Sequence, residues 1–329
     1  MRVLVTGSAG FIGNQITGCL QRNGHKVHGI DLIDCYPYEQ CDARDFFRHE
    51  DYHYDLVIHC AALVGGRQKI ENSPVAYAQN LELDAALFQW AERVKPGRIV
   101  YISSVAAYPV ELQQQLPPDW LLDKYELQDA LNAFAGDPEF QGKVTVLPPP
   151  RRPELREEDI DLDKPRLPDK VYGWAKLTGE MLARESSVPV SVARPFTVYG
   201  EGQDDVFPFA NLIMQVKNYC DPVTVWGSGT QVRDFIHVED VANAILVMAE
   251  QGIDGPVNLC TGTGISLRDL AGKMIAAFPS QLGNHHPAVE TLPDKTEGLP
   301  YRVGDPAKLH EFYVPKITLE DGIRKGLRA

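Results

Sequence analysis

Near its amino terminus the chain reads Val3-Leu4-Val5-Thr6-Gly7-Ser8-Ala9-Gly10-Phe11-Ile12-Gly13. The apolar run predicts a strand, and the residues after Gly10 predict a helix. Gly7 permits a tight turn, Gly10 lets the backbone approach a pyrophosphate, and Gly13 lets the helix pack closely on the sheet. The N–H groups of the first helical turn, at Phe11 and Ile12, would then face the phosphates. The stretch therefore predicts a turn that binds a dinucleotide.

The glycine spacing, G-x-x-G-x-x-G, departs from the usual G-x-G-x-x-G and is weak evidence by itself. An acidic residue further along the chain gives independent support for a dinucleotide site. Asp31 ends the next apolar run, Lys26–Ile30. A carboxylate there accepts hydrogen bonds from the ribose hydroxyls of NAD and repels the 2′-phosphate of NADP. Leu32 and Ile33 follow, so no arginine is adjacent to neutralise that phosphate. We expect NAD as the cofactor; the alternative is that Asp31 only caps a strand end.

Along the rest of the chain, short apolar runs alternate with amphipathic stretches of helical length. The predicted strands are 3–5, 26–30, 56–58, 98–102 and 190–193, and the predicted helices are 11–23, 75–94, 173–186, 206–219, 239–251 and 267–278. This alternation is typical of an α/β fold, a Rossmann-like doubly wound parallel sheet, with a smaller C-terminal α/β substrate domain. We expect an NAD-binding domain over 1–195, with a return segment at about 233–260. The substrate domain would take 196–232 and 261–329.

One segment interrupts this pattern, an insertion over residues 111–153. Trp120, Leu127, Leu131 and Phe134 share one face of a predicted amphipathic helix, and a short β-like run, 144–147, follows. The insertion is either a surface excursion that packs its own apolar stripe, or a lid or oligomer contact beside the site.

Composition excludes several classes of partner. The 329 residues hold 32 basic and 45 acidic side chains, a formal net charge of -13, which opposes binding to nucleic acid or to an anionic membrane. No apolar run approaches the roughly 20 residues that cross a bilayer, and no signal peptide is predicted. The six cysteines form no C-x-x-C pair, so we expect a reduced, cytoplasmic protein without a metal. A zinc site using His285 and His286 is the alternative.

A second motif supplies candidate catalytic residues. Tyr172 and Lys176 stand four residues apart in a predicted helix, so both project from one face. An ordinary phenol, with a pKa of about 10, is a poor base at neutral pH, and a nearby ammonium favours its ionised form. Ser104 follows the strand 98–102 and is placed to bond the same substrate oxygen. We expect these three residues to oxidise a carbinol; the alternative is an ordinary helix face.

These motifs together resemble the extended short-chain dehydrogenase/reductase family, in its nucleotide-sugar epimerase/dehydratase branch, over nearly the whole chain. Ser103-Ser104 followed by Tyr108-Pro109, together with residues 61–66, most resembles the GDP-mannose 3,5-epimerase subgroup. The matching stretches are 6–13, Asp31, 41–44, 59–62, Asn80, Ser103-Ser104, 172–176, 194–200, 226–235 and 301–306.

The resemblance implies roles for further residues. For the cofactor it implies Asp42 at the adenine, with Ala61, Ala62 and Asn80 lining the site. For a nucleotide-diphosphate sugar it implies Arg233 and Arg302 as a diphosphate clamp, with Trp226 near the base. Thr197 stands where the family usually has an asparagine that contacts a substrate phosphate. The alternative for each arginine is a surface salt bridge, and the family also implies a homodimer.

Departures from the family pattern decide which reaction we expect. Val105 and Ala106 replace the Asp-Glu pair of the 4,6-dehydratases, and Ala106 also replaces the cysteine of the 3,5-epimerases. We therefore expect an epimerase that transiently oxidises a sugar hydroxyl through Tyr172 and NAD and then reduces it from the other face. The alternatives are a dehydratase that recruits Glu111 or the insertion, a net sugar oxidoreductase, and an NAD-binding sensor without turnover. Arg67 and Lys69 are either substrate-loop residues or solvated charges.

Overall fold

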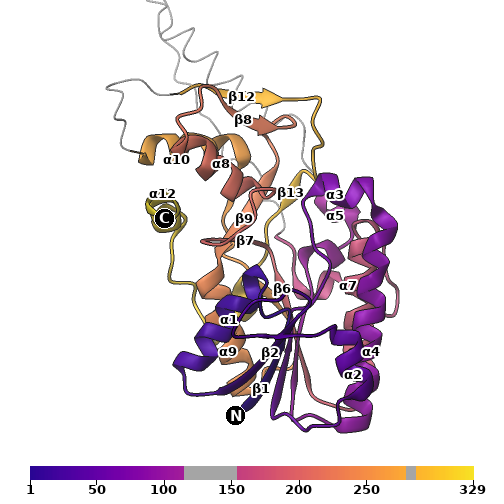
Figure 1. Cartoon of the computed structure of the whole chain (residues 1–329). Helices are drawn as coiled ribbons and strands as arrows, with labels where there is room; N and C mark the ends of the chain where they lie inside the picture. The colour runs from indigo at the N-terminus through magenta and orange to yellow at the C-terminus, as the bar shows by residue number, and fades with distance from the viewer. Residues whose placement is uncertain (115–153, 279–286) are drawn as a thin grey trace, which may run out of the picture.

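A parallel sheet forms the larger part of the molecule (Figure 1). The computed structural model describes residues 1–114, 154–278 and 287–329. Within them the sheet has seven strands in the order β10-β6-β5-β4-β1-β2-β3. Their bounds are β1 Arg2–Thr6, β2 Lys26–Asp31, β3 Glu39–Gln40, β4 Leu56–His59, β5 Ile99–Ile102, β6 Val190–Pro195 and β10 Gly255–Leu259.

Alternation along β1 explains how the two faces of the sheet are covered. Val3 and Val5 face one layer, which contains α1 (Phe11–Arg22) and α9 (Val238–Gln251). Leu4 faces the other layer. That layer contains α2 (Ala43–His49), α4 (Gln79–Val94) and α7 (Lys170–Glu185). The helices lie on opposite sides of the sheet in Figure 1, which confirms the doubly wound α/β fold.

The smaller part of the molecule is built on two short sheets. In one, β9 (Val232–His237) pairs with β7 (Thr197–Tyr199), β11 (Gly264–Ser266) and β13 (Tyr301–Arg302). In the other, β8 (Val223–Trp226) pairs with β12 (Val289–Leu292). Three helices pack against them around a core that includes Phe209, Leu270 and Ile323. These helices are α8 (Pro208–Lys217), α10 (Leu267–Ala277) and α12 (Leu319–Arg328), and a short α11 (Ala307–His310) precedes α12.

Two predicted elements differ from the structure. The single helix expected over 75–94 is a 3₁₀ turn, η1 (Pro74–Ala78), followed by α4; such a turn is common where a helix starts. The helix expected from residue 173 begins earlier, at Lys170. The helix and strand predicted inside the insertion fall within residues 115–153, outside the described part of the chain. The domain boundaries stay a prediction.

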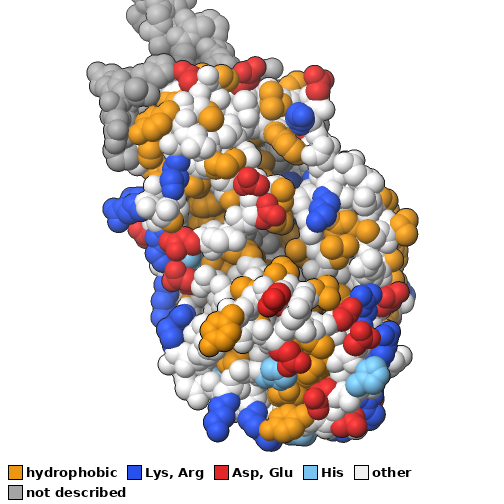
Figure 2. Space-filling model, in the orientation of Figure 1, with side chains coloured by type: hydrophobic (Ala, Val, Ile, Leu, Met, Phe, Trp, Pro, Cys, Tyr) orange, Lys and Arg blue, Asp and Glu red, His pale blue; other side chains and the backbone are white. Residues whose placement is uncertain are grey.

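Short elements complete the description and position the site. They are η2 (Val105–Ala107), η3 (Glu157–Asp159), α3 (Arg67–Asn72) and α5 (Val110–Gln113). None of the helices among the described residues is both long enough and apolar enough to span a membrane. The surface is hollowed between the larger and smaller parts of the molecule (Figure 2).

Candidate active site

The glycine turn lies at the carboxyl end of β1, next to β4. The sheet order reverses direction between these two strands, which is where α/β sheets of this kind bind ligands. Gly7 has a φ of +70°, and a Cβ there would lie 2.7 Å from the backbone nitrogen of Ala61. A Cβ on Gly13 would collide with the carbonyl oxygen of Gly7. Both glycines are therefore required by close backbone approaches.

The residues around this turn fit a dinucleotide. Gly10 is the N-cap of α1 and no side chain caps the helix, so the N–H groups of its first turn remain available to an anion. Asp31 lies beside the turn, where one carboxylate oxygen accepts the N–H of Ala9 at 2.9 Å and the other accepts the N–H of Ile33 at 3.2 Å. A turn without side chains, an uncapped helix N-terminus and a neighbouring carboxylate suit a pyrophosphate and a ribose.

The other predicted cofactor residues shape the loops around this crevice. Asp42 caps α2 by accepting the N–H of Arg44 at 2.8 Å, and it also pairs with the guanidinium of Arg44. Asn80 is buried, and its amide exchanges two hydrogen bonds with the backbone of Leu63, at 2.7 and 3.0 Å. Asn80 therefore fixes the loop after β4 that contains Ala61 and Ala62.

The predicted catalytic residues come from the end of β5 and the start of α7. Ser104 follows β5 and its hydroxyl accepts the N–H of Ala106 at 3.1 Å. The ring of Tyr172 meets that of Tyr77 edge-on, with centroids 6.0 Å apart. A Cβ on Gly173 would collide with the carbonyl oxygen of Ala106, so this glycine lets α7 pack directly against the turn that carries the serine.

Lys176 is buried behind these residues. Its ammonium donates to the carbonyl oxygen of Ile102 at 2.8 Å and lies 5.1 Å from the ring centroid of Tyr101. The side chain is fixed at its far end, and only 3% of the residue is exposed. The carbonyl and the aromatic face both stabilise a positive charge.

The predicted clamp arginines lie on neighbouring strands. Arg302 on β13 pairs in register with Arg233 on β9. Burial, together with the charge of Arg302, lowers the pKa of Arg233 to about 9. Arg302 donates through Nε to Gln113 at 2.6 Å and through a terminal nitrogen to Asp169 at 2.5 Å. Arg67 donates to both oxygens of the Asp169 carboxylate, at 2.9 and 3.0 Å.

Asp169 is a site residue that the sequence did not indicate. An aspartate directly before a helix is typical of an N-cap, so nothing in the sequence points to the arginines. Burial opposes ionisation of this carboxyl, but Arg302 and Arg67 hold its pKa below the ordinary value.

Comparison with known proteins agrees with this architecture. Residues 3–129 and 142–260 match the sequence model of the NAD dependent epimerase/dehydratase family. The chain belongs to this family. Enzymes of this family depend on NAD, which confirms the cofactor predicted from the glycine turn and Asp31.

Relatives of this family member have several different activities. It is 26% identical to a dTDP-4-dehydro-6-deoxy-D-allose reductase of Streptomyces sp, over 94% of this chain and 89% of that protein. It is 23% identical to GDP-mannose 3,5-epimerase 1 of Oryza sativa subsp. indica, over 98% and 80% of the two chains. The structure of UDP-glucose 4-epimerase from Thermotoga maritima has a TM-score of 0.75 at 22% identity, over 100% of this chain and 98% of that one.

The remaining predicted residues of this NAD-dependent enzyme lie in the smaller part of the molecule or at its surface. Thr197 starts β7, which pairs with β9, and Trp226 ends β8 with 38% of its surface exposed. The ammonium of Lys295 lies 5.7 Å from the Trp226 ring. Within the part of the chain that the structure describes, neither residue forms a hydrogen bond or ring contact with the two arginines. No group of three or more His, Cys, Asp or Glu side chains among the described residues is placed to hold a metal. The alternative zinc residues, His285 and His286, lie outside those residues.

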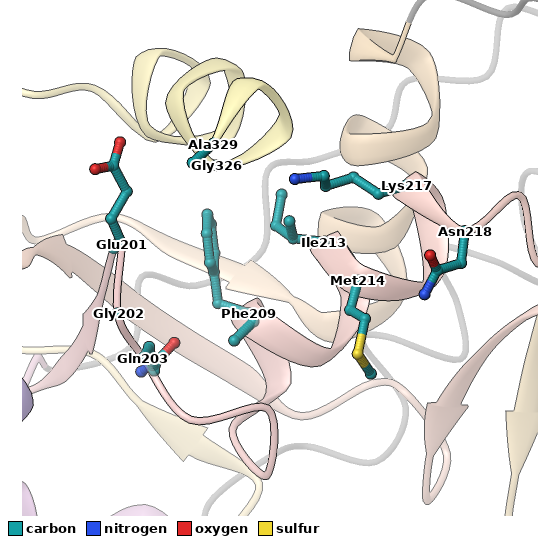
Figure 3. Close-up of a pocket in the computed structure, with 12 residues that line it drawn as sticks. Glu201, Gly202, Gln203, Phe209, Ile213, Met214, Lys217, Asn218, Gly326 and Ala329 are labelled. Carbon is teal, nitrogen blue, oxygen red and sulfur yellow. The ribbon is translucent and has the colours of Figure 1, made fainter.

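A separate cavity of about 270 Å³ lies between α8, the end of α12 and the loop after β7 (Figure 3). Phe209, Ile213 and Met214 form its apolar side, and Glu201 and Lys217 stand at its edge. None of its lining residues is among the predicted site residues.

Proposed function

We propose that this enzyme is an epimerase of a nucleotide-diphosphate sugar that oxidises one sugar hydroxyl and reduces the same carbon again within each turnover. One observation carries the proposal: Ser104 directly after β5, and Tyr172 and the buried Lys176 on α7, belong to the same part of the molecule as the glycine turn that fits the cofactor. Arg233 on β9 and Arg302 on β13 favour a substrate that contains a diphosphate, because guanidinium groups bind phosphate oxygens well.

The cofactor would be held by the amino-terminal half of the chain. In the proposal the backbone of Gly7, Gly10 and Phe11–Gly13 takes the pyrophosphate, and Asp31 and Asp42 take the adenosine end. Ala61, Ala62 and Asn80 form the loop beside it, and Tyr172 and Lys176 face its reactive end. When bound, NAD supplies the acceptor and the donor of the hydride.

The chain's own residues would handle the proton. Tyr172 takes the proton of the sugar hydroxyl and later returns it, and Lys176 stands one turn further along the same helix with its ammonium held by the carbonyl oxygen of Ile102. Ser104 donates to the same sugar oxygen and so holds it at the phenol. Since the proton returns to the oxygen from which it came, this set needs no further acid or base.

The substrate would span the space between the two parts of the molecule. In the proposal Arg233 and Arg302 bind the diphosphate and Trp226 packs near the base. Thr197, which replaces the usual asparagine, contributes one hydroxyl near a phosphate.

The residues after Ser104 favour an epimerase over a dehydratase. Val105 and Ala106 are apolar and buried, at 5% and 4% exposure, so neither supplies the acid and base that loss of water requires. Glu111, the alternative acid, is exposed and paired with Arg166 at 2.6 Å.

The deciding experiment incubates the protein and NAD in D₂O with UDP-, GDP-, CDP- and dTDP-sugars and follows the sugars by NMR. Inversion of one carbon without deuterium in the sugar skeleton is the expected result. Tyr172→Phe should lower the rate at least about a hundredfold, the low end of a general acid–base contribution. Tyr219→Phe, a change at an exposed tyrosine of the smaller part, is the matched control. Full turnover by Tyr172→Phe contradicts the assignment.

A reductase is the second candidate, because two relatives at 25–26% identity, both from Streptomyces, are dTDP-4-dehydro-6-deoxy-D-allose reductases. It differs from an epimerase in consuming the reduced cofactor. Steady loss of absorbance at 340 nm with a keto-sugar and NADH therefore supports a net reductase, whereas constant absorbance during inversion supports the epimerase.

A further inference from the structure

Two arginines from distant parts of the chain meet at one carboxylate. Arg67 begins α3 on the larger part of the molecule, and Arg302 lies on β13 of the smaller part. Asp169 accepts hydrogen bonds from both, at 2.9 Å and 3.0 Å from Arg67 and at 2.5 Å from Arg302. The three side chains are only 23%, 16% and 10% exposed for Arg67, Arg302 and Asp169 respectively.

The ion pairs of this cluster leave one guanidinium without a carboxylate partner among the described residues. Arg233, next to Arg302 in register, donates to the carbonyl oxygen of Val232 and forms no ion pair with a carboxylate of the described residues. Glu71 pairs with Arg67 at 2.7 Å. Three guanidinium groups thus have two carboxylates as ion-pair partners, and Asp169 is the one of those two that contacts Arg302. The charge of Glu297 also acts on Arg233, but without an ion pair between them. An uncompensated buried cation is costly, so the cluster favours an incoming anion.

The carboxylate of Asp169 does not serve its own helix. Asp169 is the N-cap residue of α7, where an aspartate usually accepts an N–H of the first turn, but its side chain makes no such bond. The next residue, Lys170, has a φ of +59°, in the left-handed region that is unfavourable for a residue other than glycine. The carboxylate is hydrogen-bonded to the two arginines instead.

We propose that Asp169 is an internal counter-ion that competes with the substrate's diphosphate for the arginines, and that Arg67 belongs to the same anion site. This rests on the proposed function, which assigns the diphosphate to Arg233 and Arg302. Asp169 occupies terminal donors that a phosphate would use, so an anion must take them over. Asp169 and Arg67 therefore set the affinity of the site, Asp169 by weakening it and Arg67 by strengthening it.

The proposal fixes the sign of each substitution. Asp169→Asn removes a negative charge next to the anion while keeping the size and one oxygen acceptor. Two like charges a few ångströms apart in a partly buried site repel each other strongly, and relief of this repulsion outweighs the loss of order in one side chain. The anion should therefore bind more tightly to the variant. If Asp169 only held the arginines in place, the anion would bind more weakly.

The experiment titrates the NAD-saturated protein with inorganic pyrophosphate by calorimetry. Asp169→Asn should tighten binding about tenfold, and Arg67→Gln should weaken it at least threefold. Asp163→Asn is the matched control, because it removes one charge from an exposed acid paired with Arg184. Unchanged or weaker binding by Asp169→Asn overturns the proposal. If that variant does not fold, Arg67→Gln decides, and unchanged binding by it overturns the proposal.

The counter-ion proposal and the proposed function can each be disproved without the other. Pyrophosphate binding needs no turnover, so tightening by Asp169→Asn supports the counter-ion even if no sugar is converted. Conversely, if a nucleotide sugar is inverted while Asp169→Asn leaves pyrophosphate binding unchanged, the epimerase stands and the counter-ion is wrong.

Discussion

Gly13 has no room for a side chain, because a Cβ would collide with the carbonyl oxygen of Gly7. Gly13→Ala must therefore push α1 away from the glycine turn. Forcing one carbon into a packed site costs about 1–3 kcal/mol. We expect a lower midpoint of thermal unfolding and at least tenfold weaker NAD binding, because the N–H groups of α1 move away from the pyrophosphate. Differential scanning fluorimetry and NAD titration measure the two effects.

Gly272 supplies the control for that change. It lies in α10, it is exposed, and a Cβ there would meet nothing within 4 Å. Gly272→Ala should raise the stability of the protein by about 0.5–1 kcal/mol, since alanine favours a helix, and leave NAD binding unchanged. If both variants lose NAD equally, close packing at Gly13 is not the cause.

At the scale of one element, α9 depends on a histidine cap. His237 is the N-cap of α9, and its Nδ1 accepts the N–H of Glu239 at 3.2 Å, which requires a neutral ring. Burial, more than the nearby charge of Lys325, lowers the pKa of His237 below its ordinary value of 6.5.

The pH dependence of stability follows from that shift. Below about pH 6.5 the unfolded chain takes up a proton on this ring that the folded chain resists, so the free energy of unfolding falls as the pH falls. The loss is at most about 1.4 kcal/mol per pH unit. His237→Asn keeps a capping oxygen that does not titrate. Urea unfolding at pH 8, 6.5 and 5 should give a smaller loss for this variant; equal losses contradict the assignment to His237.

Some of these helices and strands are predictable from the sequence, and others are not. Long apolar or amphipathic stretches such as α1, α9 and the central strands are predicted to within a few residues, because each buries a continuous face. The glycine turn and the Tyr172–Lys176 spacing are local patterns and are also evident. Two-residue strands such as β3 and β13 give no periodic signal. The meeting of Arg67 with Asp169, 102 residues apart, depends on how α3 and α7 pack together, which no local pattern encodes.

At the scale of the whole molecule, one buried ion pair joins several distant segments. Arg194 on β6 donates two hydrogen bonds to Glu180 on α7, at 2.9 and 2.6 Å, and both residues are almost fully buried. Glu180 also accepts from Ser103 at the end of β5. Arg194 donates further to the hydroxyl of Tyr108 and to the carbonyl oxygen of Glu157, which follows the insertion. The helix of Tyr172 is therefore tied to the sheet and to the segment after residue 153 through one guanidinium.

Removing the acid from this pair should destabilise the whole protein. Glu180→Gln leaves the Arg194 charge buried without a counter-ion, a loss of about 3–5 kcal/mol in the free energy of unfolding. Glu185→Gln is the control on the same helix, because Glu185 is exposed and pairs with the exposed Arg184, so it should cost less than about 1 kcal/mol. Urea unfolding measures both variants under the same conditions. If the two changes cost the same, Arg194 is stabilised by its other acceptors, and the pair with Glu180 does not hold α7 against the sheet.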